Sequence, residues 1–565
     1  MTAREALQRY WHYDDFRPLQ GEVVESVLAG RDTLALMPTG GGKSLCFQVP
    51  TMVRDGLCLV ITPLIALMKD QVENLRRRDI RAAAIYTGMS HDQQQAALDN
   101  CQFGPYHFLY ESPERLESEA FRKRLGMLPI CLIAVDEAHC ISQWGYDFRP
   151  SYLRIADVRE LLPEVPMLAL TATATPQVAE DIQARLGFKE PHVLQQSFHR
   201  GNLHYIVRRV GNMQQSAQEA KTAQIIHILD KVAGSGIVYV RNRKRAQEVA
   251  ETVCAAGISA GYYHAGLSSG ERSERQQAWK EGRTRVIVCT NAFGMGIDKP
   301  DVRIVIHHDL PDSIEAYYQE AGRAGRDGKT AYAVLLYHPD DKALAGRRVA
   351  NNYPPKEFVE RVYHNTCDLY QIGLGSGLDH SFTLHMDELC RTMRLPLLQT
   401  YSALRLLDHA GYIRFEEEHE TSPRVRINVP PHALAEYTLS HEQRTLLDSL
   451  MRHYTGVFTD LQYLADDRQH DLLVSLAQRR VITYIPRTVA CTFTLLQERQ
   501  DNIYLPPRIY EERQATYTER LRAMLEYAEQ EQFCREQLLL AYFGEHDAPV
   551  CGHCDVCVRR SKDKG

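Results

Sequence analysis

The chain has 565 residues, more than one hydrophobic core usually supports, so about three to five domains are expected. Its composition, 44% hydrophobic and 24% charged, is ordinary for globular proteins, and no apolar run approaches the roughly 20 residues that cross a bilayer. We therefore expect no membrane association. The formal net charge of −6 does not exclude nucleic-acid binding, because a groove can be locally positive and backbone amides also bind phosphate.

The first residues, MTAREALQRY, lack the apolar stretch and small-residue cleavage site of a secretory signal, which predicts a cytoplasmic protein. Ten of the 14 cysteines are scattered singly between Cys46 and Cys491. In that compartment they are expected to be buried reduced thiols and not disulfides. The other four lie near the C-terminus and form a separate pattern.

Short apolar runs alternate with helical patterns from Arg31 to about Phe188, as in TLALM, LCLVITP, HFLYES, CLIAVDEA and MLALTATAT. A second series follows, with GIVYV, TRVIVCT, VRIVIHHDL and TAYAVLLY. Such alternation is typical of βα units around a parallel sheet. The sequence thus predicts an α/β protein with two tandem parallel-sheet lobes, over residues 1–205 and 206–340.

The strand-helix alternation stops after about Asp340. Within 341–430, two helical patterns precede EEEHETSPRVRINV, which predicts linker helices and a winged helix with a two-stranded wing. Within 431–510, DLLVSLAQRRVITYIP and then RTVACTFTLLQER suggest a second helix and hairpin of the same kind. Residues 511–565 are expected to form a helical module that contains the clustered cysteines.

A glycine-rich turn follows the strand TLAL and opens a helical pattern. Bare backbone amides at such a turn can approach a phosphate, and the lysine adds a positive charge. Ser44 has the hydroxyl expected to bind Mg²⁺. The general phosphate-loop pattern has glycine where Met37 stands, and the alternative is a glycine turn beside a surface lysine. The nucleotide-binding set predicted in this turn is Thr39, Gly40, Gly41, Gly42, Lys43 and Ser44.

In CLIAVDEAHC, a buried strand leads directly to Asp136 and Glu137. An aspartate there suits a hold on Mg²⁺, and the neighbouring glutamate suits polarising an attacking water. The alternative is an acidic pair at a helix N-terminus. Together with Lys43, these residues form the predicted catalytic group of the first lobe.

In the second lobe, YYQEAGRAGRDG places Arg323 and Arg326 three residues apart, so on a helix they would point roughly the same way. An arginine that meets charge on the γ-phosphate can raise the rate by roughly 10³ to 10⁵. A solvated basic helix end is the alternative. Both arginines are predicted to be catalytic.

Near the end of the chain, two Cys-x-x-Cys steps share Cys554. Four thiolates would make a closed tetrahedral zinc site, which is structural because it leaves no place for a catalytic water. His553 lies between ligands and could compete for one position. The predicted zinc ligands are Cys534, Cys551, Cys554 and Cys557.

Taken together, these motifs resemble those of the RecQ family of superfamily 2 helicases over nearly all of residues 10 to 340. The resemblance extends to YDDFRPLQ, ITPLIALMKDQ, YESPERL, LTATAT, YYHAGLSSGERS and TNAFGMGIDKPDVR, and AHCISQWGYDFRP is the most discriminating string. It implies two RecA-like lobes, an ATP-dependent DNA helicase that moves 3′ to 5′, and a role in DNA recombination and repair. ATP, Mg²⁺ and Zn²⁺ are the implied cofactors, and single-stranded and partly duplex DNA the implied partners.

The resemblance also implies roles for individual residues. Thr171 and Thr173 would couple the lobes. A tyrosine face can stack on a base and a glutamine amide can pair with adenine, although plain packing is the alternative. The implied adenine contacts are Tyr13, Arg17 and Gln20, and the implied nucleotide contacts of the second lobe are Gly296 and Asp298.

In the family the segment around Trp144 is an aromatic-rich loop that couples strand binding to hydrolysis. Aromatic faces and a guanidinium can stack on single-stranded bases without reading sequence. Trp144 in the core is the alternative. The implied DNA contacts are Trp144, Phe148 and Arg149 in this loop, and Pro63, Ser112 and Arg115 along the phosphate track.

One departure from the family is the order of modules, because about 190 residues separate the motor from the cysteines and zinc comes last. The leading hypothesis is a DNA helicase that works as a monomer, associated with the nucleoid. An RNA-directed motor of the same superfamily is the alternative among enzymes. An ATP-gated DNA clamp that never unwinds is the alternative outside enzymes.

Overall fold

The computed structural model describes residues 1–563 except 87–88, 143–144, 146–147, 213, 295–298, 421–423, 430–433, 435–436, 438, 454–460, 463–466 and 486–488. The chain divides into two compact units. Unit 1 comprises Met1–Ala345 and Thr516–Gly565, and unit 2 comprises Gly346–Ala515. The second unit is therefore inserted into the first.

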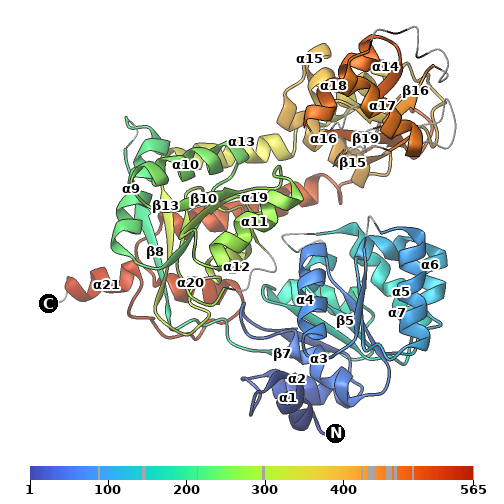
Figure 1. The fold of residues 1–565 in the computed structure, drawn as a ribbon. Coiled ribbons are helices and arrows are strands. Elements are labelled where there is room, and N and C mark those ends of the chain that lie inside the picture. Colours follow the sequence, from blue (N-terminus) through green and yellow to red (C-terminus); the bar gives the residue numbers. More distant parts are fainter. Residues whose placement is uncertain are drawn as a thin grey trace. The chain divides into compact units, whose positions relative to one another are not determined.

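The first lobe of unit 1 is a parallel sheet in the order β3-β4-β2-β5-β6-β1-β7, with helices on both faces (Figure 1). Its strands are continuous apolar runs because both faces are buried. The strands are β1 (Thr33–Leu36), β2 (Leu57–Ile61), β3 (Ala82–Ile85), β4 (Phe108–Glu111), β5 (Ile130–Val135), β6 (Met167–Thr171) and β7 (Val193–Gln195). The helices are α1 (Ala3–Trp11), α2 (Gln20–Leu28), α3 (Leu45–Val53), α4 (Ile65–Arg76), α5 (His91–Phe103), α6 (Glu119–Leu125), α7 (Ile155–Leu161) and α8 (Pro176–Arg185).

The second lobe is another parallel sheet, in the order β10-β11-β9-β12-β13-β8. Its first strand, β8 (Leu203–Arg209), spans the expected boundary at residue 205. The other strands are β9 (Ser235–Tyr239), β10 (Ala260–Tyr263), β11 (Val286–Cys289), β12 (Val302–His307) and β13 (Ala331–Tyr337). The helices are α9 (Ala217–Lys231), α10 (Arg243–Ala255), α11 (Ser269–Lys280) and α12 (Ile314–Ala321). The two predicted parallel-sheet lobes are confirmed.

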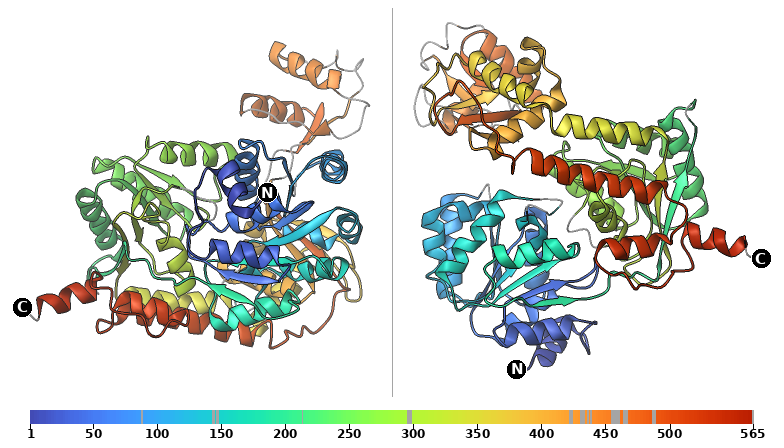
Figure 2. Two further views of the ribbon diagram at one scale, coloured as in Figure 1. Left: turned by 90° about the horizontal axis from the view of Figure 1, so that it is seen from below. Right: turned by 180° about the vertical axis from the view of Figure 1, so that it is seen from behind.

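The chain leaves unit 1 within α13 (Asp340–Asn352) and returns within α19 (Glu511–Glu529). These helices run side by side, and Lys342 Nζ lies 3.4 Å from a Glu529 carboxylate oxygen (Figure 2). Helices α20 (Arg535–Tyr542) and α21 (Asp555–Lys562) follow. Cys534 and Cys554 directly precede them, Cys551 lies between them, and Cys557 lies within α21. The module order that departs from the family pattern thus arises from an insertion between two neighbouring helices.

This C-terminal region packs on the second lobe. The Phe543 ring lies 4.8 Å from that of Phe198 and 5.1 Å from that of Tyr318. The Tyr527 ring lies 5.4 Å from that of Tyr317. All five of these rings are buried. The C-terminal region therefore shares an apolar interface with the motor.

Unit 2 contains one module nested inside another. The outer module has α14 (Lys356–Leu369), α15 (Met386–Thr392), α16 (Leu397–His409) and the antiparallel sheet of β14 (Ser381–Leu384), β19 (Val489–Leu495) and β15 (Ile413–Glu420). The inner module has α17 (His441–His453), α18 (Asp467–Gln478) and the sheet of β17 (Leu461–Gln462), β16 (Arg424–Ile427) and β18 (Ile482–Ile485). Each module has its own apolar core.

Both hairpins expected in this region are wrong. Strand β15 pairs with β19, and β16 pairs with β18, so the two strands of the expected wing are not partners. Likewise β18 and β19 belong to different sheets. Closeness in sequence suggested hairpins, but each strand pairs where its apolar face completes a core.

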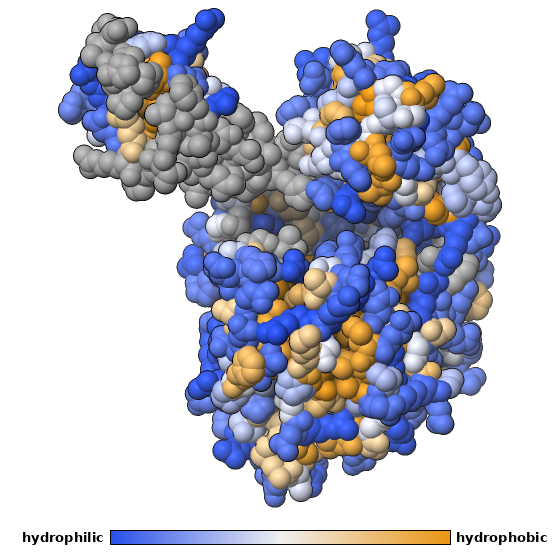
Figure 3. Space-filling model, turned by 90° about the vertical axis from the view of Figure 1, so that its right-hand side faces the viewer, coloured by the Kyte–Doolittle hydropathy of each residue, from blue (hydrophilic) through white to orange (hydrophobic). Residues whose placement is uncertain are grey.

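The face shown in Figure 3 is mostly hydrophilic, and hydrophobic residues gather in a patch on the first lobe. No described helix is both long enough and apolar enough to span a membrane.

Candidate nucleotide, nucleic-acid and zinc sites

The glycine turn after β1 has the backbone that a phosphate loop requires. Gly40 and Gly42 have φ values of 82° and 77°, which favour glycine. Ser44 is the residue before α3, so the turn leads directly into a helix N-terminus, where backbone amides and the helix dipole attract anions. The donor set therefore fits the phosphates of a nucleotide.

Two of the three expected adenine contacts lie against this turn. The Gln20 side-chain amide donates to the Gly41 and Gly42 carbonyls at 3.1 and 3.0 Å. Arg17 Nη1 donates to the Gly40 carbonyl at 2.9 Å. Both side chains therefore stabilise the glycine turn. The third expected contact, Tyr13, is exposed to solvent. Adenine binding by these residues stays a prediction.

The acidic pair follows β5 at the carboxyl edge of the first sheet. Asp136 N–H donates to the Ile61 carbonyl at 2.9 Å, which ties the pair to the end of β2. Burial, and next the Glu137 carboxylate, raise the pKa of Asp136 to about 6. Glu137 has a φ of 49°, an uncommon value for a non-glycine residue that often marks a functional site. Adjacent carboxylates, with Glu137 buried and Asp136 half-buried, favour a neighbouring cation, so the pair fits Mg²⁺.

A chain of polar contacts connects the acidic pair to the end of β6. His139 Nδ1 lies 3.4 Å from Glu137 Oε2 and 2.9 Å from Thr171 Oγ1. Thr171 Oγ1 also accepts from the Thr173 backbone N–H at 3.3 Å. His139 was not singled out from the sequence, although its place directly after the acidic pair was the available signal. Both threonines are buried beside the acidic pair.

The two arginines do not share a helical face, contrary to expectation. Helix α12 ends at Ala321, because the glycines of the GRAGRDG string interrupt it, with Gly325 at a φ of 63°. Arg326 lies over the phosphate loop: a Cβ built on Gly40 would be 3.2 Å from Arg326 Cγ. Arg323 instead donates to the Gly294 carbonyl within the second lobe.

A cavity of about 1020 Å³ lies in unit 1 between the lobes. Pro63 and Arg149 line it from the first lobe, and Arg241 and Arg323 line it from the second. Helix α19 contributes Arg520, which also donates to the Gly145 carbonyl of the aromatic-rich loop at 3.0 Å. Several arginines on its walls suit a negatively charged strand.

The other described residues expected to contact DNA do not line this cavity. Ser112 is buried at the end of β4. The Arg115 guanidinium lies over the Phe121 ring at 5.2 Å and donates to Gln94 Oε1 at 2.5 Å, so it is engaged within the first lobe. Phe148 is half-buried. Three predicted site residues lie outside the described part of the chain: Trp144, Gly296 and Asp298.

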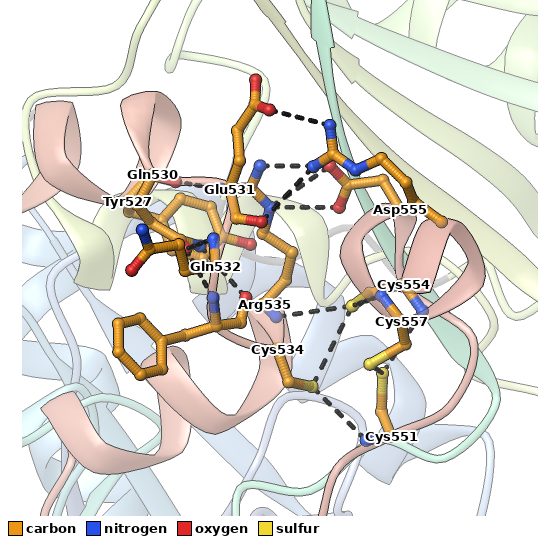
Figure 4. Close-up of polar contacts among 12 residues, drawn as sticks. Tyr527, Gln530, Glu531, Gln532, Cys534, Arg535, Cys551, Cys554, Asp555 and Cys557 are labelled. Atoms are coloured by element: carbon orange, nitrogen blue, oxygen red, sulfur yellow. Dashed lines mark hydrogen bonds and ion pairs between the residues drawn. The ribbon is translucent and has the colours of Figure 1, made fainter. Parts of the chain in front are cut away.

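The four C-terminal cysteines converge, with their sulfur atoms within 4.8 Å of one another (Figure 4). The Cys534 and Cys554 sulfurs are 4.0 Å apart, as are those of Cys551 and Cys557. Tetrahedral zinc with bonds of about 2.3 Å separates its sulfur ligands by about 3.8 Å. The cluster therefore fits zinc. His553 lies beside it, with its ring 4.4 Å from that of His204.

Backbone amides support the thiolates. The N–H groups of Cys551 and Cys554 donate to Cys534 Sγ and Cys551 Sγ, both at 3.3 Å. The Arg535 N–H donates to Cys554 Sγ at 3.4 Å, and its buried guanidinium binds Asp555 at 3.0 Å (Figure 4). These contacts hold the starts of α20 and α21 together around the cluster, as supporting shells do in metal sites.

Comparison with protein-family models agrees with this layout. The chain matches the DEAD/DEAH box helicase model over residues 17–182 and the helicase conserved C-terminal domain over 220–328. It matches the RecQ zinc-binding model over residues 496–558.

Curated relatives match the motor. The probable ATP-dependent DNA helicase RecS of Bacillus subtilis is 43% identical over 343 residues, which cover 60% of this chain and 68% of that protein. The ATP-dependent DNA helicase RecQ of Synechocystis is 41% identical, with 59% and 70% covered. For RecQ of Pasteurella multocida the identity is 42% and the matched part is 53% of the relative. The chain thus spans about half the length of several curated relatives.

Among solved structures, the helicase MrfA bound to DNA and AMPPNP aligns with a TM-score of 0.52 at 20% identity. The alignment covers 61% of this chain and 51% of that one. At that identity the likeness concerns the fold alone.

Proposed function

Since this chain belongs to the RecQ family of ATP-dependent DNA helicases, we propose that it hydrolyses ATP to move 3′ to 5′ along single-stranded DNA and to separate duplex strands. The observation that carries the proposal is the position of Arg326, a second-lobe residue whose side chain lies over Gly40 of the first lobe. A motor of this kind needs such a contact, because it makes hydrolysis depend on how the lobes meet.

Each group at the phosphate loop has a role in this reaction. The amides around Gly40 to Gly42 and the Lys43 ammonium bind the β- and γ-phosphates. Ser44 and Asp136 would hold Mg²⁺, which when bound neutralises phosphate charge. Arg326 meets the negative charge that develops as the bond to the leaving ADP breaks. Arg323, in the cavity wall, is proposed as a second basic group that stabilises negative charge during hydrolysis.

Glu137 is the residue that positions the attacking water. Its Oε2 atom is buried and accepts no hydrogen bond among the described residues, while His139 lies 3.4 Å away. A buried acceptor of this kind can take a hydrogen bond from water and orient its oxygen toward the γ-phosphorus. The polar contacts of His139 with Thr171, and of Thr171 with Thr173, would couple ATP hydrolysis at this site to the end of β6.

The DNA strand is proposed to follow the cavity between the lobes. Pro63 and Arg149 contribute from the first lobe, with Trp144 and Phe148 of the aromatic-rich loop and with Ser112 and Arg115 near the first sheet's edge. Adenine is proposed to meet Tyr13, Arg17 and Gln20, and Gly296 and Asp298 to face the nucleotide. We further infer a monomer that acts in recombination and repair in the cytoplasm, at the nucleoid.

The deciding experiment offers the protein a duplex with a 3′ tail, one with a 5′ tail and an RNA duplex with a 3′ tail, each with ATP and Mg²⁺. Displacement of the strand from the 3′-tailed DNA alone is the expected result. Displacement of the RNA would favour an RNA-directed motor. Binding and ATP turnover without any displacement would favour an ATP-gated clamp.

A further inference from the structure

Arg200 lies in the segment that joins the two sheets, between β7 and β8. Its half-buried guanidinium reaches both lobes. Nη1 lies 3.4 Å from the Thr39 carbonyl oxygen and 3.3 Å from that of Gly322. Nη2 donates to the carbonyls of Ala324 and Gly325 at 2.9 and 3.3 Å. One side chain therefore connects the phosphate loop to the glycine-rich segment that carries Arg326.

The surfaces that Arg200 connects fit closely. The Thr39 hydroxyl donates to the Gly322 carbonyl at 3.1 Å, and a Cβ on Gly322 would lie 2.2 Å from that hydroxyl oxygen. A planar guanidinium with five N–H donors can bind several carbonyls at once, which a lysine ammonium does less well. Arg200 thus supports the contact that places Arg326 over Gly40.

The backbone of the same segment is held by the cysteine-bearing region. Arg200 N–H donates to Glu536 Oε1 at 2.9 Å, and Glu536 is only 2% exposed. Glu536 lies in α20, two residues after the predicted zinc ligand Cys534. Two residues before Arg200, the Phe198 N–H donates to Glu545 Oε1 at 2.7 Å, and Glu545 lies just after the end of α20. The start of α20, beside the cysteine cluster, therefore holds the backbone of Arg200.

We propose that Arg200 is a positioning residue through which the zinc module regulates ATP hydrolysis, by setting Arg326 against the phosphate loop. This inference rests on the proposed function. Misplacing a catalytic group by about 1 Å can cost about 100-fold in rate. Because the Arg200 guanidinium binds backbone carbonyls of the phosphate loop and of the glycine-rich segment, its loss lowers kcat for ATP and leaves KM for ATP nearly unchanged.

The test measures ATP turnover with saturating single-stranded DNA for the full chain, four single variants and one double variant. Arg200→Ala and Glu536→Ala are expected to lower kcat by about 10-fold to 100-fold, in line with the cost of misplaced groups. Arg200→Lys is expected to recover part of the loss. The matched control is Arg209→Ala, since Arg209 pairs with Glu531 of the same region at 3.1 Å but does not reach the phosphate loop. Zinc content and thermal melting show that each variant is folded.

The double variant Arg200→Ala/Glu536→Ala is expected to lose no more than the worse single variant, because both changes act on one connection. A kcat within twofold of wild type for folded, zinc-loaded Arg200→Ala would overturn the inference. Equal loss in Arg209→Ala would also overturn it, because general loosening of the module would then explain the effect. If wild-type protein itself showed no ATP turnover, the proposed function would fail instead.

Discussion

At the residue scale, the phosphate loop, the acidic pair and Arg326 meet in a small region although they come from both lobes. Asp136 and Glu137 follow β5, and the glycine turn follows β1, so the parallel sheet itself brings them to one edge. Arg326 reaches that region from the other lobe. The site therefore combines groups fixed by the first sheet with one arginine whose position depends on contact between the lobes.

Lys43→Ala and Glu137→Gln are expected to abolish ATP turnover and to leave single-strand binding largely intact. The reason is that the phosphate loop and the cavity between the lobes are lined by different residues. ATPase assays and fluorescence anisotropy with labelled DNA measure the two properties. Lys123→Ala, at an exposed lysine paired with Glu119, is the control and should behave as wild type. Near-normal hydrolysis by either site variant would disprove the catalytic assignment.

Arg326→Ala is expected to lower kcat by about 10³-fold, the lower end of the range for arginine fingers. Arg323→Ala should lower it less, because the Arg323 guanidinium is bound to the Gly294 carbonyl and does not lie over the phosphate loop. Single-turnover hydrolysis with bound DNA compares the two. A larger loss of kcat for Arg323→Ala would mean that Arg323, and not Arg326, contacts the γ-phosphate during hydrolysis.

At the scale of elements, Arg149, which follows the acidic pair in sequence, lines the cavity. Arg149 N–H donates to the Cys140 carbonyl at 2.9 Å, and its side chain lies 3.5 Å from the Pro63 carbonyl. The loop after β5 is thereby connected to the loop after β2. On the proposed strand path, Arg149 is therefore the described residue that connects the cavity to the segment after the acidic pair.

Arg149→Ala or Trp144→Ala is expected to weaken the stimulation of hydrolysis by single-stranded DNA more than basal hydrolysis. Either change removes a group that senses the strand and leaves the phosphate loop unaltered. ATPase rates with and without DNA, at several DNA concentrations, give the ratio. Equal loss in both conditions would assign the loop to folding and not to coupling.

Helices α9 and α13 are connected by a buried ion pair, with Lys221 Nζ 2.8 Å from both Asp341 carboxylate oxygens. Lys221→Met would leave a buried carboxylate without its partner, which typically costs about 3 to 5 kcal/mol. Chemical denaturation should show this loss in free energy of unfolding. Lys231→Met, at the exposed end of the same helix, should change it by about 0.5 kcal/mol or less. Similar values for both would show that the pair does not stabilise the lobe.

At the scale of the whole molecule, the cysteine cluster lies in a region that packs against the second lobe. The cysteine cluster is expected to contain one zinc ion per chain, as measured by elemental analysis of purified protein. Structural zinc contributes roughly 10 to 16 kcal/mol in small peptide modules, so Cys554→Ser should unfold the starts of α20 and α21.

From the sequence, Cys554→Ser is expected to spare basal hydrolysis and to abolish duplex binding and unwinding, because the lobes have their own cores. The structure changes the first expectation. Glu536 and Glu545 anchor the segment next to the phosphate loop, so basal kcat should fall as well. Unwinding and ATPase assays on the zinc-free variant measure both. Normal unwinding together with an absence of zinc in wild type would refute the zinc assignment.

The sequence alone determined the features whose chemistry lies within a few consecutive residues. The glycine turn with Lys43, the pair Asp136 and Glu137, and the Cys-x-x-Cys steps are of this kind, because spacing along the chain sets which atoms can share one ligand. The alternating apolar runs also determined the two parallel-sheet lobes. The RecQ resemblance followed from the same local strings.

Only the tertiary structure decided which distant residues meet. It separated Arg326 from Arg323, paired β15 with β19, and placed unit 2 between α13 and α19. Local spacing carries no information on these contacts, because a strand or a guanidinium pairs wherever burial and hydrogen bonding are best satisfied. Arg200 is the clearest case: its partners Thr39 and Glu536 lie 161 and 336 residues away, and only folding brings all three together.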